Sequence, residues 1–223
     1  DAKEPYDSAR AKRYASRVGK LIFVVPSSRI DCAYAIGMCA RCLTFPTDDM
    51  EACVDRITVY LAQNESVGVN YSADAVKPEL HAYSDSDWQV THSTTGFAVM
   101  LAGAAVSYSS KRQQSIALSS TEAEIMAASQ CACEVMFIRN LYGEMGGDIS
   151  KPTVIYVDNS GAVQLARDRR SCQRSRHIQR RFLKLREWQA EGHIKLVYVS
   201  TDDNAADVLT KPLPTAAFRK HTD

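Results

Sequence analysis

The stretch Ser119-Ser-Thr-Glu-Ala-Glu-Ile-Met-Ala-Ala128 decides how the rest of the chain is organised. Ser119 followed by Glu122 is a capping box, so a helix is expected to begin here, with Glu122 reaching back to the Ser119 amide. Glu124 has no such role. Because small apolar residues follow it three, four and seven positions later, it lies on a face that can pack closely against a sheet. The stretch therefore predicts a half-buried carboxylate that needs a partner.

Two short β-like stretches supply candidate partners. His81-Ala-Tyr-Ser-Asp-Ser-Asp-Trp88 lies upstream and Thr153-Val-Ile-Tyr-Val-Asp-Asn159 lies downstream, and each carries Asp at or near its C-terminal end. Oxygen ligands are those that hard cations such as Mg²⁺ prefer. Carboxylates that converge from two strand ends and a helix therefore predict a metal site.

The remaining periodicity predicts an α/β protein. Strands are expected over residues 79–88, 95–101, 105–109, 153–158 and 193–199, and helices over 8–23, 28–43, 47–63, 119–145, 160–167, 171 or 175–191, and 203–209. Three antiparallel strands followed by alternating helices and strands predict a mixed five-stranded sheet flanked by helices. The expected domains are a helical segment over 1–75, the sheet domain over 79–214 and a tail over 215–223.

Composition adds a few bounds. Of the 223 residues 45% are apolar, which favours a folded protein, and 27 Lys and Arg against 26 Asp and Glu leave the bulk charge uninformative about a polyanionic partner. Seven cysteines without a regular framework predict reduced thiols in an intracellular protein. Cys39-Ala-Arg-Cys42 has the spacing of half a zinc or redox site, but core packing explains it better. A chain that begins at Asp1 without Met is expected to be part of a longer polypeptide.

Basic residues gather between positions 167 and 186. Most charge runs are solvated helix faces, but here nearly all charges of one sign lie on one expected helix and the residues before it, a pattern suited to phosphate contacts. The predicted nucleic-acid-binding residues of this run are Arg174, Arg176, His177, Arg180, Arg181 and Lys184.

Several short motifs together resemble the ribonuclease H domain of copia-type LTR retrotransposon Pol polyproteins, over about residues 80–214. They are Tyr83-Ser-Asp-Ser-Asp-Trp88, Ser93-Thr-Thr-Gly-Phe97, Ala117-Leu-Ser-Ser-Thr-Glu-Ala-Glu124, Val157-Asp-Asn159, Arg176-His-Ile178 and Ala206-Asp-Val-Leu-Thr-Lys-Pro-Leu213. Residues 19–23, 29–31 and 59–61 are similar to the end of the family's reverse transcriptase. Because the chain contains no Tyr-x-Asp-Asp motif, no polymerase activity is expected.

The resemblance implies a ribonuclease H-like fold and a metal-dependent endonuclease that cuts the RNA strand of RNA/DNA hybrids, leaving 3′-hydroxyl and 5′-phosphate ends. It implies Asp85, Glu124, Asp158 and Asp207 as catalytic ligands of two Mg²⁺ ions, with Mn²⁺ as a substitute. Four such acids repel each other without a metal, which argues against a purely structural role. The implied partners are the hybrid and the polyprotein's reverse transcriptase, with no membrane and no small-molecule cofactor. The implied location is cytoplasmic, in a virus-like particle, or nuclear.

Each assignment has an alternative. Asp87 competes with Asp85, a capping role explains Glu122, an Asx turn competes for Asp158, and Asp202 and Asp203 compete with Asp207.

Recognition of a hybrid is expected to rest on shape and 2′-hydroxyl contacts, with Lys111, Arg112, Gln113 and Asn159 near the RNA strand. The chain also departs from the family pattern, since residues 200–206 contain no His and Gln179 stands where an acid is usual. The alternative functions are therefore a degenerate or domesticated non-catalytic module that binds nucleic acid, and a nuclease of the same fold that cuts DNA.

Overall fold

The computed structural model describes residues 7–71, 79–167 and 176–222, and the side chains of Ser27, Arg167 and residues 176–179 lie outside that description. The chain divides into two compact units, residues 1–69 and residues 70–223.

The N-terminal unit consists of helices α1 (Ser8–Ser28), α2 (Ala33–Cys39) and α3 (Asp48–Gln63), with 3-10 turns η1 (Ile30–Cys32) and η2 (Ala40–Cys42) between them. Its core contains Tyr14 and Val18 of α1, Ile36 of α2 and Val54 of α3, all at most 1% exposed. The prediction that α1 ends near residue 23 is wrong, because the helix continues through Pro26. Pro26 lacks the amide that would bond to the carbonyl four residues earlier, and its ring crowds that carbonyl, but only two residues of the helix follow it.

A buried ion pair fixes the turn after α1. Both guanidinium nitrogens Nε and Nη2 of Arg29 donate to the carboxylate of Asp31, at 3.0 and 2.8 Å. The Tyr60 hydroxyl of α3 donates to Asp31 Oδ2 at 2.9 Å, and Arg29 Nη1 donates to the Asn64 carbonyl at 2.9 Å. A buried charge that is paired and hydrogen-bonded in this way ties η1 to the end of α3.

The C-terminal unit is built on a five-stranded sheet of order β3-β2-β1-β4-β5. Its strands are β1 (His81–Asp87), β2 (Thr94–Leu101), β3 (Ala104–Arg112), β4 (Thr153–Val157) and β5 (Ile194–Tyr198). β1, β2 and β3 are antiparallel, whereas β4 runs parallel to both β1 and β5. The β2–β3 turn has positive φ at Ala102 (53°) and Gly103 (85°), as expected of a two-residue hairpin turn. The predicted fold class is confirmed.

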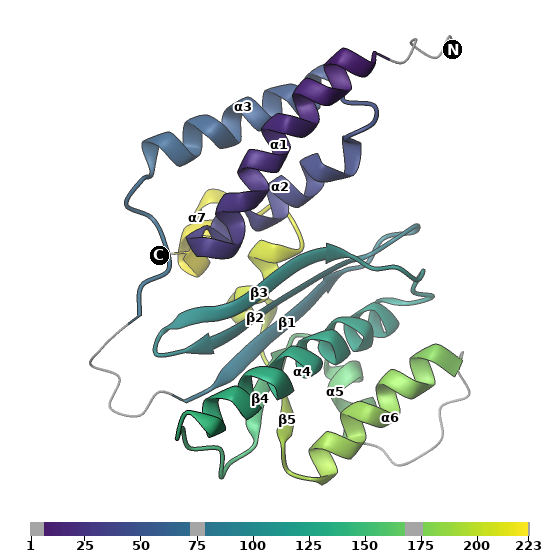
Figure 1. The fold of residues 1–223 in the computed structure, drawn as a ribbon. Helices are drawn as coiled ribbons and strands as arrows, with labels where there is room; N and C mark the ends of the chain where they lie inside the picture. The colour runs from purple at the N-terminus through teal and green to yellow at the C-terminus, as the bar shows by residue number, and fades with distance from the viewer. Residues whose placement is uncertain (1–6, 72–78, 168–175, 223) are drawn as a thin grey trace. The chain divides into compact units, whose positions relative to one another are not determined.

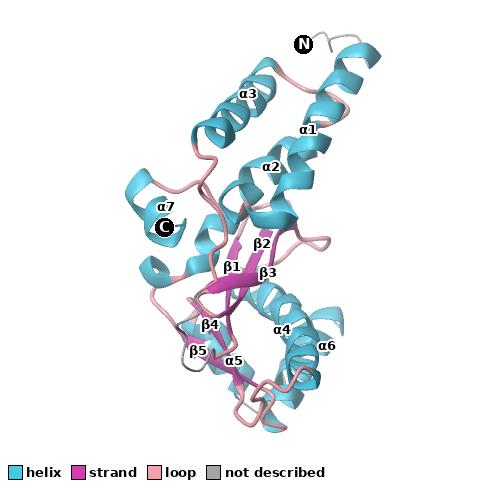
Figure 2. Ribbon diagram, turned by 60° about the vertical axis from the view of Figure 1, so that its left-hand side comes forward, coloured by secondary structure: helices cyan, strands magenta, loops and turns pink. Residues whose placement is uncertain are grey.

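Helices α4 (Ser120–Glu144), α5 (Ser160–Arg167) and α6 (Arg176–Ala190) cover one face of the sheet, as Figures 1 and 2 show. Buried side chains of α4 and α6, such as Ile125 and Leu185, pack there against Ala82, Ile155 and Leu196 of the strands. The opposite face receives the C-terminal segment at the 3-10 turn η4 (Ala205–Leu209). The acid-bearing end of β1 therefore lies between two packed layers.

The C-terminal segment differs from its prediction in two ways. Residues 203–209 form no α-helix but fall in the 3-10 turns η3 (Thr201–Asp203) and η4, and the expected tail over 215–223 contains helix α7 (Thr215–Thr222). Lys220 holds α7 in place, since its ammonium donates to the Asp202 carbonyl and to the Asp203 carboxylate at 2.6 and 2.7 Å.

The cysteines within the described ranges are free thiols, and Cys39 and Cys42 belong to no metal-binding group there. Cys39 is 2% exposed and packs in the core of the N-terminal unit. Among the described helices, none has an apolar stretch long enough to cross a membrane.

Candidate active site

Two acids lie at the start of α4, and only Glu124 belongs to the acid cluster, whereas Glu122 caps the helix. Ser119 Oγ accepts from the Glu122 amide at 3.2 Å, as a capping serine does. The Glu122 carboxylate accepts from the Leu118 amide at 3.2 Å, rather than from that of Ser119 as expected. Glu122 is thus occupied with the helix terminus, while Glu124 points to the sheet.

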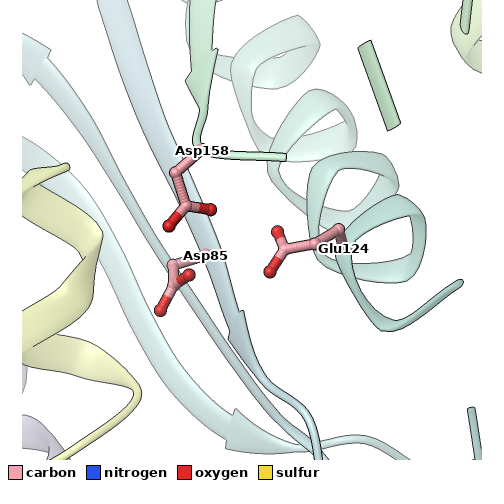
Figure 3. Close-up of side chains that lie close together, drawn as sticks. All are labelled: Asp85, Glu124 and Asp158. Atoms are coloured by element: carbon pink, nitrogen blue, oxygen red, sulfur yellow. The ribbon is translucent and has the colours of Figure 1, made fainter. Parts of the chain in front are cut away.

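Three carboxylates converge where the parallel strands β1 and β4 end. Asp85 comes from β1, Asp158 directly follows β4, and Glu124 comes from the second turn of α4 (Figure 3). One oxygen of each lies within 4.8 Å of the others. Asp85 and Glu124 are only 2% and 5% exposed. Parallel strands bring their C-terminal ends to the same edge of the sheet, which is why residues 73 positions apart in sequence meet here.

Each of these carboxylates accepts a hydrogen bond from a hydroxyl group nearby. The pairs are Ser86 with Glu124 (2.9 Å), Thr201 with Asp158 (2.9 Å) and Thr210 with Asp85. The Ser86 amide also donates to the same Glu124 oxygen, Oε1, at 3.1 Å. The hydroxyls hold the acids in fixed orientations. The sequence reasoning missed them, although Ser86 adjoins an assigned acid and Thr210 lies in a quoted motif.

The site carries more negative charge than its surroundings compensate. Glu124 Oε2 and Asp207 Oδ1 are buried and have no hydrogen-bond partner among the described residues. Burial raises the pKa of Asp85 to about 7, while the Thr210 hydrogen bond opposes the shift. Burial and the charges of Asp85 and Asp158 raise the pKa of Glu124 well above its usual value. Ionising the cluster is costly without a cation, and an all-oxygen donor set with a free buried oxygen fits a hard divalent ion.

Asp207 lies at the edge of this cluster. It is 4% exposed in η4, and burial raises its pKa. Lys211 Nζ is 2.9 Å from Asp207 Oδ2 and 4.0 Å from Asp85 Oδ2. Asp207 does not belong to the group of three whose oxygens lie within 4.8 Å. The structure therefore brings the fourth predicted ligand beside Asp85 but pairs it with an ammonium.

Gly96 of β2 allows η4 to approach the site. It is the cross-strand partner of Asp85. A Cβ atom at Gly96 would lie 2.6 Å from Thr210 Cγ2, 2.8 Å from Leu209 Cβ and 3.0 Å from the Ala206 carbonyl oxygen. The turn thus lies flush on the strand, and a glycine is needed for this close approach.

The alternative acids have other partners. Asp87 accepts from Gln89 Nε2 at 2.7 Å and lies outside the group of three. Asn159 Oδ1 accepts from the Ala162 amide at 2.9 Å, so the turn-forming role considered for Asp158 falls to Asn159. Asp203 pairs with a lysine of α7.

The residues expected near an RNA strand have different environments. Lys111 and Arg112 are exposed at the end of β3. Gln113 is 6% exposed, and its Nε2 donates to Thr95 Oγ1 and to the Ala123 carbonyl, both at 3.0 Å. Gln113 therefore links β2 to α4 rather than presenting its amide to solvent.

The basic helix is described only in part. Arg174, and the side chains of Arg176, His177 and Gln179, lie outside the described residues. Arg180 is exposed, Arg181 is half-buried, and Lys184 Nζ is 2.9 Å from Glu187 Oε1. Burial raises the pKa of the Cys133 thiol, and the positive charges of Arg181 and Lys184 oppose this shift. These two side chains therefore lie near Cys133 of α4. The nucleic-acid-binding roles of the basic residues and the catalytic roles of the four acids stay predictions.

Similarity to known proteins is extensive in sequence. The chain is 36% identical over 210 residues to the Retrovirus-related Pol polyprotein from transposon RE2 of Arabidopsis thaliana, covering 92% of this chain and 14% of that protein. It is 32% identical over 209 residues to the corresponding polyprotein from transposon TNT 1-94 of Nicotiana tabacum, covering 92% and 16%. The homologues of this chain are copia-type retrotransposon Pol polyproteins. The chain spans about one seventh of the length of these Pol relatives.

The chain is also similar to one further protein in sequence and to one solved structure. It is 33% identical over 129 residues to the Secreted RxLR effector protein 161 of Plasmopara viticola, covering 56% of this chain and 90% of that protein. A structure of the foamy viral protease-reverse transcriptase in complex with RNA/DNA hybrid matches with a TM-score of 0.50 and 11% identity, over 96% of this chain and 27% of that one. The likeness shows the fold, which is ribonuclease H-like in the sheet unit. No protein-family model matches the chain.

Proposed function

We propose that this chain is a metal-dependent ribonuclease H that cuts the RNA strand of RNA/DNA hybrids during retrotransposon reverse transcription. The observation that carries the proposal is the convergence of Asp85, Glu124 and Asp158, with a buried Glu124 oxygen that has no hydrogen-bond partner among the described residues. A fold stabilised only by its own contacts would neutralise or separate such acids. A divalent cation bound between the carboxylates would offset their mutual repulsion.

The residues that would hold Mg²⁺ or Mn²⁺ are Asp85, Glu124 and Asp158, with Asp207 beside them. A pair of such ions, when bound, activates a water molecule and stabilises the leaving 3′ oxygen of a phosphodiester. The protein's own contribution is orientation. Because hydroxyl groups already fix the three carboxylates, little rearrangement is needed when a ligand binds.

Positive charge at two places supports a duplex as the substrate. Lys111 and Arg112 are exposed at the end of β3, and Arg181 and Lys184 lie near Cys133 of α4. Cys133 is nine residues beyond the catalytic glutamate, or about 13 Å along the helix axis. Phosphates of the second strand of a hybrid would meet this helix while the first strand lies at the acids. The foamy viral protease-reverse transcriptase, which has a similar fold, was solved in complex with an RNA/DNA hybrid. That complex supports an RNA/DNA hybrid as the substrate here.

The test is cleavage of an end-labelled RNA/DNA hybrid by the full chain in Mg²⁺, Mn²⁺ or EDTA. We expect metal-dependent cleavage of the RNA strand that Asp158→Asn abolishes. Asp87→Asn is the matched control, because Asp87 lies on the same strand as Asp85 but outside the cluster. Undiminished cleavage by Asp158→Asn would refute the site. Preference for a DNA duplex of the same sequence would refute the substrate.

A non-catalytic binding module is the second candidate. Two observations favour it: the ammonium of Lys211 already neutralises Asp207, and a homologue that the chain nearly covers is named as a secreted effector. Such a module would bind the hybrid equally well in EDTA and would cut it under no metal condition. The same assay with a binding measurement therefore separates the two functions.

A further inference from the structure

Lys211 places a positive charge inside the acid site. Its ammonium lies 2.9 Å from Asp207 Oδ2 and 4.0 Å from Asp85 Oδ2. The side chains of these two acids are 6% and 3% exposed, while that of Lys211 is 32% exposed. The lysine thus reaches from solvent to a buried pair of carboxylates.

The ammonium divides the site into two halves. Asp85, Glu124 and Asp158 offer oxygens within 4.8 Å of one another. On the other side of Asp85, the carboxylate of Asp207 is engaged by Lys211 through Oδ2, while its buried Oδ1 has no hydrogen-bond partner among the described residues. The half between Asp85 and Asp207 therefore already contains a cation, whereas the half at Glu124 does not.

We propose that Lys211 is a positioning residue that acts as a resident cation between Asp85 and Asp207. A first divalent ion binds at Asp85, Glu124 and Asp158, where the ammonium is 4.0 Å from Asp85 alone, and a second ion reaches Asp207 only when the ammonium moves away from its 2.9 Å contact. This inference rests on the proposed function in assuming that the acids bind divalent ions. Lys211 is then the reason that the second divalent ion binds more weakly than the first.

The chemistry of lysine suits this role. Its ammonium is a compact charge on a flexible four-carbon stem, so it can leave one carboxylate without moving the backbone. Its partial exposure provides a path toward solvent and toward a phosphate at the site. Two cations a few ångströms apart repel each other, so the ammonium and a second divalent ion exclude each other near Asp207.

The test is Mn²⁺ binding to the full chain at pH 8, measured by the loss of the free-ion EPR signal and by calorimetry. We expect two steps in the wild-type protein. In Lys211→Met, which keeps an apolar stem of similar length, the second step becomes about tenfold tighter because one unit of competing charge is gone. Lys211→Arg, which retains the charge, keeps the second step weak. In Lys211→Met combined with Asp207→Asn, the gain disappears because the second site has lost its ligand.

The outcomes separate this inference from the proposed function. A second step in Lys211→Met that is unchanged or weaker, in a variant whose circular dichroism and first step match those of the wild type, overturns the role of Lys211 alone. A gain that persists when Asp207→Asn is added also overturns it, because the effect would not act at that acid. A wild-type chain that binds no Mn²⁺ and cuts no hybrid overturns the proposed function as well.

Discussion

Substitution of Gly96 by alanine tests whether the approach of η4 to β2 builds the site. The added Cβ would lie 2.6 Å from Thr210 Cγ2 and 2.8 Å from Leu209 Cβ, whereas carbon atoms normally pack at about 3.5–4.0 Å. The turn must therefore retreat by about 1 Å. Overpacking of this kind costs roughly 1–3 kcal/mol, and a 1 Å misplacement of reacting groups lowers cleavage on the order of 100-fold.

The assays are urea unfolding and hybrid cleavage of Gly96→Ala. Gly143→Ala is the matched control, because its Cβ meets only the flexible end of Ile149, at 2.8 Å, and its stability should change by less than about 1 kcal/mol. Thr210→Ser is a specific rescue, since it removes the methyl group nearest to the new Cβ and keeps the hydroxyl that binds Asp85. Gly96→Ala should regain part of its activity when combined with Thr210→Ser. Wild-type stability and cleavage in Gly96→Ala alone would show that the close contact does not position the site.

Three further predictions concern stability. Folding raises the pKa of Asp85 from 3.8 to about 7, so between these pH values the folded protein binds more protons than the unfolded chain. Without metal, the free energy of unfolding should therefore fall from pH 4 to pH 8. Urea titrations that give the same free energy of unfolding across this range would contradict the prediction. Arg139→Met should cost roughly 2–4 kcal/mol in urea unfolding, since the buried guanidinium donates to the Lys151 and Ile149 carbonyls and to Thr153 Oγ1. Tyr60→Phe should cost roughly 1.5–3 kcal/mol in urea unfolding, since the lost hydrogen bond goes to the buried carboxylate of Asp31.

The convergence of three acids could be predicted because each lies in a segment with a strong local signal. A capping serine marks the start of α4 and so places Glu124 in its second turn. Asp85 lies near the C-terminal end of β1 and Asp158 directly follows β4, and the parallel pairing of these strands up to Ser84 and Val157 brings the two acids together. Local pattern and sheet geometry were enough to bring the two strand ends and α4 together, whereas the choice of Asp85 over Asp87 came from the family resemblance.

The supporting groups could not be predicted because they come from segments brought together only by tertiary packing. Thr201 and Thr210 lie 43 and 125 residues from the acids they contact. Gln113 was expected near the RNA strand together with Lys111 and Arg112. Its burial depends on contacts with Thr95 and Ala123, which no alternation of polar and apolar residues encodes.

The uncompensated charge of the acid cluster also affects how retrotransposon copies decay. Most random substitutions destabilise a protein, and cells remove the products that fold poorly. Replacing one crowded acid with a neutral residue of similar shape instead relieves repulsion, so under the proposed function such a copy should lose catalysis while its fold becomes more stable. Among copies released from selection, those inactivated at this cluster should persist as well-folded proteins, available for a new use in the host genome.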